Sequence, residues 1–389
     1  MSDPRPDVAT VIAQAANAHQ VRYGTSPGQR RLLRDLVRCR TAALGGHKHQ
    51  CTHCGHEIIS YNSCRNRHCP TCQGAARARW LAARAADLLP VPYFHVVFTL
   101  PAPVAALALQ HKRLLYGLLF RATATTLRTI ARDPQHLGAD IGFLAVLHTW
   151  GQTLQHHPHV HCVVPGGGLA PDGSRWIPAR PHFFLPVRVL SRSFRCTFLR
   201  LLRAAYRQGA LRPHGPLAHL ADPTAWHRWL QPLERTEWVV YAKPPFGGPR
   251  QVLKYLARYT HRVAISNQRL LSLQDDQVTF LWKDYAHQAR TRTMTLDATE
   301  FLRRFLLHHL PRGFQHIRQY GLLGNRRRAT ALARCRDLLG QPPEPPEHDH
   351  AAPADEPPPR DACPKCRTGR LISEPRTCAS LFGGLSACV

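Results

Sequence analysis

Near the middle of the chain, residues 156–168 read His156-His157-Pro158-His159-Val160-His161-Cys162-Val163-Val164-Pro165-Gly166-Gly167-Gly168. Side chains along a β-strand point alternately to its two faces. A strand over 159–164 therefore turns His159 and His161 to one face and sends the apolar residues between and after them into a core. Two imidazoles side by side on a rigid strand are a typical pair of ligands for a divalent metal ion. The alternative is a row of polar histidines on a solvated strand, but the regular apolar alternation favours a metal site.

The composition indicates a polyanionic partner. The chain has 389 residues, 44% of them hydrophobic, which suffices for two or three domains with real cores. Against 24 acidic residues stand 52 lysines and arginines, a net charge of +28. Most of these cations are arginines, whose planar guanidinium suits phosphate. A GC-rich genome explains arginine over lysine but not the deficit of acids, so we expect nucleic acid as the partner, before an anionic membrane.

The sequence predicts neither export nor a membrane span. The first residues contain no apolar stretch of the kind found in signal peptides. The uncharged segment 88–110 is interrupted by four prolines and a histidine. Thirteen cysteines in a chain without an export signal indicate metal binding rather than disulfides. We therefore expect a cytoplasmic protein, associated with the nucleoid if its partner is DNA.

Two C-x2-C pairs predict a structural zinc site. The pairs are 14 residues apart, close to the spacing of a zinc ribbon, and four thiolates close a tetrahedral site. Their members are Cys51, Cys54, Cys69 and Cys72. Cys64 and His68 lie between the pairs and are possible additional ligands. Arg65 and Arg67 in the same segment either contact phosphates or belong to a solvated loop.

The C-terminal part of the chain looks like a linker followed by a cysteine-containing tail. Residues 340–361 are rich in proline and acidic residues and predict a flexible linker. Beyond it, Cys363-Pro-Lys-Cys366 precedes Cys378 and Cys388. This spacing is loose, so these cysteines either form a second small zinc knuckle or remain free thiols.

The pattern of elements predicts an α+β fold. Helices are expected at 8–44, 74–89, 104–132, 190–208, 249–262 and 297–309, and 211–234 looks irregular. Strands are expected at 93–99, 143–148, 159–164 and 236–242, with a hairpin over 263–282 that turns at Asp275-Asp276. If 143–148 and 159–164 pair, His148 comes close to the histidine pair. Pro90 marks the expected boundary between a helical zinc-binding region and the α+β region.

The helix expected at 249–262 carries two tyrosines on one face. Tyr255 and Tyr259 are four residues apart, so their Cβ atoms lie about 5–6 Å from each other. Such a pair alone is more typical of core packing. Positive charge nearby favours the ionised form of a phenol, however, and makes it a better nucleophile. The helix supplies this charge from Lys254, Arg258 and Arg262. A metal that grips a phosphate beside an attacking tyrosine is a workable phosphoryl-transfer site.

Taken together, these motifs resemble those of the HUH single-strand endonucleases. More narrowly, the chain is similar to the two-tyrosine rolling-circle transposases of bacterial insertion sequences. His159-Val160-His161 matches the His-hydrophobic-His motif of that superfamily. The resemblance also rests on the motifs at 51–72, 93–101, 255–267, 300–305 and 317–321, and it covers roughly residues 10–330.

The resemblance implies a fold and a division into domains. It implies a central antiparallel sheet flanked by helices, with the histidines on a middle strand and the tyrosine helix beside it. Residues 1–89 would form a helical zinc-binding, DNA-recognition domain and residues 90–335 the HUH nuclease domain of the transposase. Residues 336–389 would form the proline-rich linker and tail.

The resemblance also implies a mechanism. His159 and His161 would hold Mg²⁺ or Mn²⁺, and Tyr255 or Tyr259 would attack single-stranded DNA at a transposon end or target. This leaves a 5′-phosphotyrosine and a free 3′-OH. Arg65, Arg67, Lys254, Arg258 and Arg262 would contact the DNA. Such enzymes usually have a third metal ligand, and the candidates are Gln152, His148, His157 and His95.

Three alternatives stay open at this point. A rolling-circle replication initiator or relaxase of the same superfamily shares the chemistry but does not account for the zinc module and the later motifs. A histidine-triad nucleotide hydrolase shares the His-x-His-x-His pattern, against which stand Pro158, the tyrosine helix and the basic charge. A non-catalytic, zinc-dependent DNA-binding protein would use the histidines and tyrosines only for packing.

Overall fold

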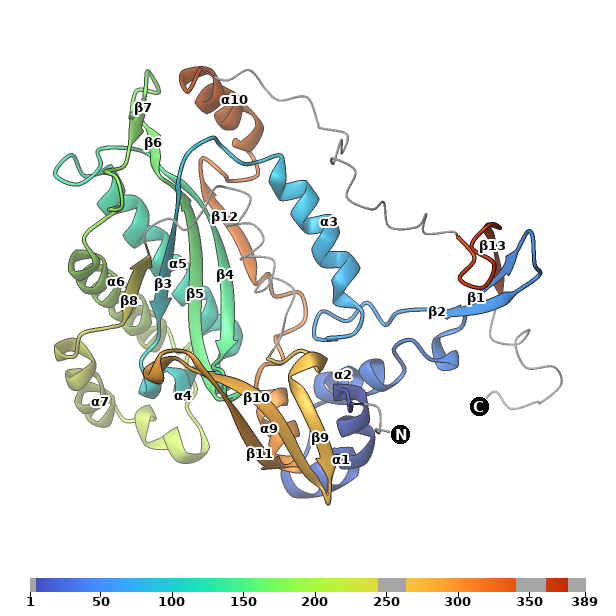
Figure 1. Cartoon of the computed structure of the whole chain (residues 1–389). Coiled ribbons are helices and arrows are strands. Elements are labelled where there is room, and N and C mark those ends of the chain that lie inside the picture. The colour runs from blue at the N-terminus through green and yellow to red at the C-terminus, as the bar shows by residue number, and fades with distance from the viewer. Residues whose placement is uncertain (1–4, 244–263, 341–361, 377–389) are drawn as a thin grey trace.

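A computed structural model of the chain describes residues 5–243, 264–340 and 362–376 (Figure 1). Its centre is a five-stranded sheet in the order β12-β4-β5-β3-β8, in which every neighbouring pair is antiparallel. The strands are β3 (Tyr93–Thr99), β4 (Gly142–Trp150), β5 (His156–Pro165), β8 (Val240–Lys243) and β12 (Ile317–Gly321). The α+β class and the central antiparallel sheet expected from the sequence are confirmed, and β5 with its histidines is the middle strand.

Helices cover one face of this sheet and enclose the main core. The apolar residues of β5 predicted to face a core, Val160, Cys162 and Val164, are fully buried there. The helices are α4 (Ala102–Gln110), α5 (Lys112–Arg132), α6 (Val187–Arg207) and α7 (Pro223–Arg235). The single helix expected at 104–132 is thus two helices that meet at His111, whose backbone is not helical. The region expected to be irregular contains α7, whose first turn is capped by the Asp222 carboxylate accepting from the Ala225 amide.

Two helices cover part of the opposite face of the sheet. They are α3 (Gln73–Ala85) and α10 (Arg328–Leu338), both on the same side in Figure 1. Trp80 of α3 and Leu332 of α10 pack with Leu144, Val146 and Val163 of the sheet. The histidines lie on the same face, farther along β5. The sheet therefore packs one face against the main apolar core, while its other face changes from an apolar core to a histidine cluster.

A second sheet and the N-terminal helices form another hydrophobic core, in the lower part of Figure 1. The sheet consists of β9 (Leu270–Gln274), β10 (Gln277–Asp284) and β11 (Arg290–Asp297), and the helices are α1 (Val8–Tyr23), α2 (Pro27–Val37) and α9 (Ala298–Leu307). Ile12 of α1 shares this core with Phe280 and Phe305. The N-terminal helices therefore pack on residues from the other side of the expected boundary at Pro90. The hairpin turn at Asp275-Asp276 is confirmed: both residues have positive φ angles, as a tight turn between twisted strands requires.

The glycines that follow β5 allow backbones to approach closely. A Cβ on Gly168 would lie 2.4 Å from the carbonyl oxygen of Asp140. This approach lets β6 (Gly167–Leu169) bridge to Asp140 and pair with β7 (Trp176–Pro178). The three glycines thus end β5 as the sequence predicts.

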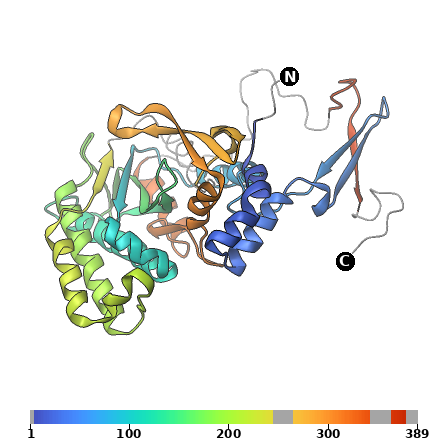
Figure 2. The same ribbon diagram turned by 90° about the horizontal axis from the view of Figure 1, so that it is seen from below.

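A three-stranded ribbon projects from the body in both views (Figures 1 and 2). It consists of β1 (Gly46–Cys51), β2 (Glu57–Tyr61) and β13 (Leu371–Arg376), with β1 in the middle. All six residues of β1 pair with β13. The C-terminal segment, expected to be a separate tail, thus returns to the N-terminal region.

Several expectations lie outside the described residues. These are the tyrosine helix at 249–262, the linker up to residue 361, and Cys378 and Cys388. Among the helices of the three described ranges, none combines the length and apolarity needed to cross a bilayer.

Candidate functional site

Adjacent strands β4 and β5 bring three histidines together on the sheet. His148 is directly opposite His159 in the register, and His161 is opposite Val146. The possible ligand nitrogens of His148, His159 and His161 all lie within 4.8 Å of one another. The ring centroids of His148 and His161 are 4.2 Å apart, and those of His159 and His161 are 4.8 Å apart. Of the four candidates for a third ligand, the structure thus brings His148 to the predicted pair.

Two neighbours orient the imidazoles of this cluster. His159 Nδ1 lies 2.6 Å from the carbonyl oxygen of His157. A carbonyl only accepts, so Nδ1 carries the proton and the lone pair of His159 is on Nε2. His95 of β3 has its Nε2 2.7 Å from Nδ1 of His161, and the two rings are stacked. A hydrogen bond to one ring nitrogen fixes the orientation of a metal-binding histidine. His95 therefore positions His161 and does not itself belong to the three-residue cluster.

Burial keeps His159, His161 and His95 neutral. It lowers the pKa of His159 to about 3 and that of His95 to about 4. It also brings the pKa of His161 well below its ordinary range, with neighbouring His148 and His159 adding to the effect. Only neutral imidazole has a lone pair for a metal. Three imidazoles within reach of one ion, of which burial keeps those of His159 and His161 neutral, fit a divalent metal, and nitrogen donors suit Mn²⁺ better than Mg²⁺, which prefers oxygen.

The two remaining candidates for a third ligand lie elsewhere. Gln152 belongs to the turn between β4 and β5, and its side-chain oxygen accepts from the Lys283 amide at 3.4 Å. It is thus directed to the second sheet. The His157 ring is exposed, 5.2 Å from that of His159, and is not part of the cluster. The structure brings neither Gln152 nor His157 into the site.

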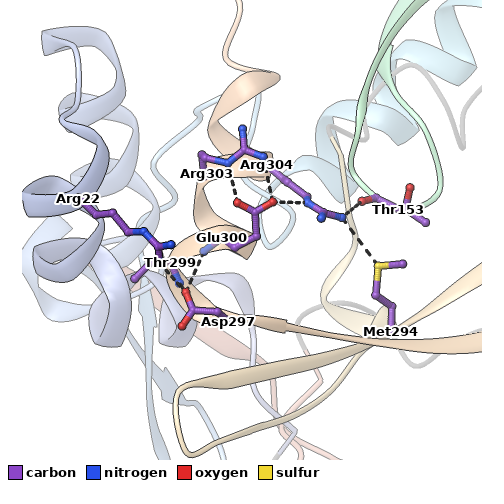
Figure 3. Close-up of polar contacts among 8 residues, drawn as sticks. All are labelled: Arg22, Thr153, Met294, Asp297, Thr299, Glu300, Arg303 and Arg304. Atoms are coloured by element: carbon purple, nitrogen blue, oxygen red, sulfur yellow. Dashed lines mark hydrogen bonds and ion pairs between the residues drawn. The ribbon is translucent and has the colours of Figure 1, made fainter.

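The turn between β4 and β5 is held by side chains from the second core. Arg269 donates to the carbonyl oxygen of Gln152 at 2.6 Å, and Arg304 donates to that of Thr153 at 3.2 Å (Figure 3). His308 donates from Nε2 to the carbonyl oxygen of Leu154 at 3.0 Å. Leu154 has a φ of 63°, which a branched side chain rarely adopts, so it needs such support. Because this turn joins the two strands that carry the histidines, its geometry sets their spacing.

Arg304 is itself held by Glu300 on α9. The Glu300 carboxylate accepts from Arg303 Nε at 2.6 Å and from Arg304 Nε at 2.7 Å (Figure 3). Hydrogen bonds from Arg303 and then Arg304 lower the pKa of Glu300 to about 2, so it is ionised at neutral pH. Of the two arginines, Arg304 is the one that continues to the Thr153 carbonyl. Replacing the two arginines one at a time can therefore distinguish the effect of the ion pair with Glu300 from the effect of the contact with the turn.

We expect Arg304→Ala to weaken binding of a divalent metal at the histidine cluster by about tenfold, as is typical when support of metal ligands is lost. Arg303→Ala removes a partner of the same carboxylate but no contact with the turn, so its metal affinity should stay within about twofold. A metal-binding titration of both variants checks this. Equal shifts in the two variants would assign the effect to the ion pair and contradict a role for the turn.

The cysteines form two clusters instead of the single set expected from the sequence. The proximal cluster consists of Cys39, Cys64, Cys69 and Cys72. The distal cluster consists of Cys51, Cys54, Cys363 and Cys366. Grouping Cys51 and Cys54 with Cys69 and Cys72 was therefore wrong. The first pair lies in the ribbon, whereas the second pair directly precedes α3 and remains with the body of the protein.

The proximal cluster is built for a tetrahedral metal. Sγ of Cys64 lies 3.7 Å from Sγ of Cys72. Four sulfurs about 2.3 Å from a zinc ion are about 3.8 Å apart, whereas a disulfide requires about 2.05 Å. The Asn66 amide also donates to Sγ of Cys64 at 3.4 Å, which favours a thiolate. Cys64 thus joins a site as the sequence suggested. Cys39, which was not predicted, supplies the ligand that the cysteines at 64, 69 and 72 lack.

Two other predicted residues of this region have structural contacts. His68 is buried, its Nε2 accepts from the Leu310 amide at 3.3 Å, and its Nδ1 bonds to Asn66. It was wrongly included among possible zinc ligands. Arg67 donates to the carbonyl oxygen of Phe314 at 2.6 Å, so its guanidinium is engaged inside the protein rather than offered to DNA. Arg65 is exposed.

Two residues next to the histidines were not predicted from the sequence. Tyr241 and Lys243 of β8 pair with Val97 and His95 of β3 and so share the histidine face. The Tyr241 ring is 48% exposed, and the Lys243 ammonium lies 5.5 Å from its centroid. An exposed aromatic ring with a cation suits a base and its phosphate. The sequence signal that could have identified them is the alternation of side chains along the strand expected at 236–242.

Five predicted site residues lie outside the described residues. They are Tyr255, Tyr259, Lys254, Arg258 and Arg262.

Known proteins resemble this chain over most of its length. A family described as "Putative transposase" matches residues 142–330, and one described as "Transposase zinc-binding domain" matches residues 11–100. The chain is 55% identical over 388 residues to "Putative transposase y4qJ" of Sinorhizobium fredii, with 96% of each chain covered. It is 30% identical over 298 residues to the "Transposase for insertion sequence element IS801" of Pseudomonas savastanoi pv. phaseolicola, covering 75% of this chain and 69% of the relative. No solved structure matches.

These similarities cover both the zinc-binding region and the sheet that carries the histidines. They also follow the order of motifs along the chain. The zinc-binding match and the cysteine clusters together support structural zinc. The chain belongs to the two-tyrosine, rolling-circle transposases of bacterial insertion sequences, which combine a zinc-binding domain with a DNA-cleaving domain.

Proposed function

We propose that this transposase nicks and rejoins single-stranded DNA at the ends of an insertion sequence through a covalent tyrosine intermediate. The observation that carries the proposal is the cluster of His148, His159 and His161 on the middle strands of the sheet. Three imidazoles that converge on a rigid support have the chemistry of a divalent metal site. A non-catalytic DNA-binding protein has no need of such a cluster.

The histidine cluster would hold a metal that acts on the scissile phosphate. His148, His159 and His161 would bind Mn²⁺ or Mg²⁺, which supplies a positive charge to polarise the phosphate and offset the charge that develops on it. His95 fixes the orientation of His161, and the His157 carbonyl fixes that of His159. The β4–β5 turn joins the two strands, whose register puts His148 opposite His159. The protein thus prepares the ligands before DNA arrives, so no reorganisation is needed at the moment of reaction.

A tyrosine supplies the nucleophile. The phenolate oxygen of Tyr255 or Tyr259 attacks phosphorus, a new P–O bond to tyrosine forms, and the bond from phosphorus to the 3′ oxygen breaks. The 3′ oxygen leaves with a proton as a 3′-OH, and the 5′ end stays on the enzyme. Attack of a 3′-OH on this phosphotyrosine reverses the step, so joining needs no nucleotide cofactor. Two tyrosines let the enzyme hold two strand ends in turn.

Removal of the metal tests the proposal. We expect EDTA to stop nicking of a single strand that bears the element's end, and Mn²⁺ to restore it. Mn²⁺ should act at lower concentration than Mg²⁺ because the cluster offers nitrogen. Full activity after exhaustive chelation, with the metal content measured, would rule out a metal-dependent mechanism.

The charge of the chain predicts how binding depends on salt. Each phosphate neutralised on a single strand contributes about −0.7 to the slope of log affinity against log salt. Three such contacts give a slope of about −2 and a roughly 20-fold loss of affinity over a fourfold rise in salt. Fluorescence anisotropy with a labelled single strand measures this slope. An affinity that does not change over this range would contradict phosphate contacts as the basis of binding.

A further inference from the structure

The distal cluster joins Cys51 and Cys54 to Cys363 and Cys366. Only the first two of these cysteines lie within the zinc-binding match, which covers residues 11–100. Sγ of Cys51 lies 3.6 Å from Sγ of Cys366, and Sγ of Cys54 lies 3.6 Å from Sγ of Cys363, a residue 309 positions away in sequence. Both distances approach the roughly 3.8 Å edge of a tetrahedral zinc–thiolate site and are far from the 2.05 Å or so of a disulfide.

The two C-x2-C turns have the same backbone shape. In the first, Gly55 donates its amide to the Cys51 carbonyl at 3.2 Å, and in the second Arg367 donates to the Cys363 carbonyl at 2.8 Å. Gly55 and Arg367 both have positive φ angles, of 66° and 59°. Two equivalent turns that face each other present four thiols to one point, as a zinc ribbon does. The two turns therefore resemble the two halves of one zinc-ribbon site.

Backbone amides and a close glycine complete the site. The His53 amide donates to Sγ of Cys51 at 3.4 Å, and the Gly369 amide donates to Sγ of Cys366 at 3.3 Å. Such bonds favour thiolates, the form that binds zinc. A Cβ on Gly369 would lie 2.4 Å from Sγ of Cys51, so a larger residue there would displace the thiol.

The ribbon buries few apolar side chains. In the parts of it whose burial is described, residues 46–61 and 362–372, the buried apolar side chains are those of Cys51 and Cys363. Ile59 is 46% exposed and Ile372 is 60% exposed. A three-stranded sheet of this size without a core normally requires a metal or disulfides. The cysteines are the residues that could supply that stability.

We propose that Cys51, Cys54, Cys363 and Cys366 bind a zinc ion of their own, separate from the one in the proximal cluster. The C-terminal segment 362–376 is then a strand of the zinc-binding module, and the metal fastens it to the N-terminal ribbon. Zinc enters as the four thiols release their protons, without oxidation or reduction. The proposal does not depend on the nuclease mechanism.

The zinc content of variants tests this assignment. We expect two zinc ions per chain in the wild type and one in the Cys363→Ser/Cys366→Ser variant. Adding Cys51→Ser to that variant should remove no further zinc, because the three residues belong to one site. Cys196→Ser, an exposed cysteine outside both clusters, is the matched control and should keep two. One zinc in the wild type, or two in the Cys363→Ser/Cys366→Ser variant, would overturn the proposal.

A measurement on the wild type avoids the risk that a variant does not fold. In the zinc-loaded protein, we expect an alkylating reagent to modify Cys196 quickly and to spare Cys363 and Cys366 together with Cys51 and Cys54. Chelation should expose all four to the reagent together. Peptide mass spectrometry reads each site separately. Alkylation of Cys363 and Cys366 at the rate of Cys196 while Cys51 stays protected would contradict a shared metal.

Discussion

Replacement of His161 by alanine is expected to lower the rate of single-strand nicking by more than about 100-fold, because loss of a ligand costs more than loss of its support. His161 is 8% exposed, and its ring lies 4.2 Å from that of His148 and 4.8 Å from that of His159, so its removal takes one of three converging imidazoles from the cluster. His148→Ala should have an effect of the same order. The His148→Ala variant is the more demanding test, because the position of His148 in the cluster follows from the pairing of β4 with β5.

His157→Ala is the matched control for these variants. His157 is exposed, belongs to the same strand and is two residues from His159. It contributes its carbonyl to the site, and the substitution leaves the carbonyl in place. We expect nicking by His157→Ala to stay within about threefold of the wild type, as is usual for an exposed side chain. A loss equal to that of His161→Ala would favour the three-histidine arrangement of a nucleotide hydrolase.

Replacement of both Tyr255 and Tyr259 by phenylalanine is expected to abolish nicking, with a loss of at least about 1,000-fold, because phenylalanine has no oxygen to attack phosphorus. Binding of single-stranded DNA should change by less than about threefold, since the rings and the charges remain. Either single variant should still nick if each tyrosine can act. Nicking assays and anisotropy on the same preparations separate the two effects.

Tyr241→Phe is the control for the loss of a hydroxyl near the site. Tyr241 lies on the histidine face of β8 and is exposed. Its proposed contact with DNA uses the ring, which phenylalanine keeps. We expect normal nicking by this variant. Residual nicking by the double tyrosine variant at the level of Tyr241→Phe would show that another group is the nucleophile.

The sequence predicts the sheet and most of its histidine face because both follow from alternation along single strands. His159, His161 and the buried Val160 lie where period two puts them. His148 needs one more step, the pairing of two strands, and it was named only as a candidate. Strand β12 was not predicted as a strand, since a five-residue segment with Arg318 and Gln319 has little apolar alternation.

The grouping of the cysteines could not be predicted from spacing. Spacing favours the nearest pair along the chain, and Cys69-x2-Cys72 is nearer to Cys51-x2-Cys54 than Cys363-x2-Cys366 is. The register of β1 with β13 overrides it, because six paired residues bring the distant turn beside the first. The hydrogen bonds of Arg67 inside the protein could not be predicted either, because its partners are the backbone carbonyls of residues 311 and 314, far away in sequence.

A covalent tyrosine intermediate can be detected directly in one measurement. The wild-type protein is incubated with Mn²⁺ and a labelled single strand bearing the element's end. It is then denatured and digested, and the peptide that carries DNA is sequenced by mass spectrometry. We predict a 5′-phosphate linked to Tyr255 or Tyr259. DNA linked to a histidine, or nicking with no covalent adduct at any time, would contradict the account.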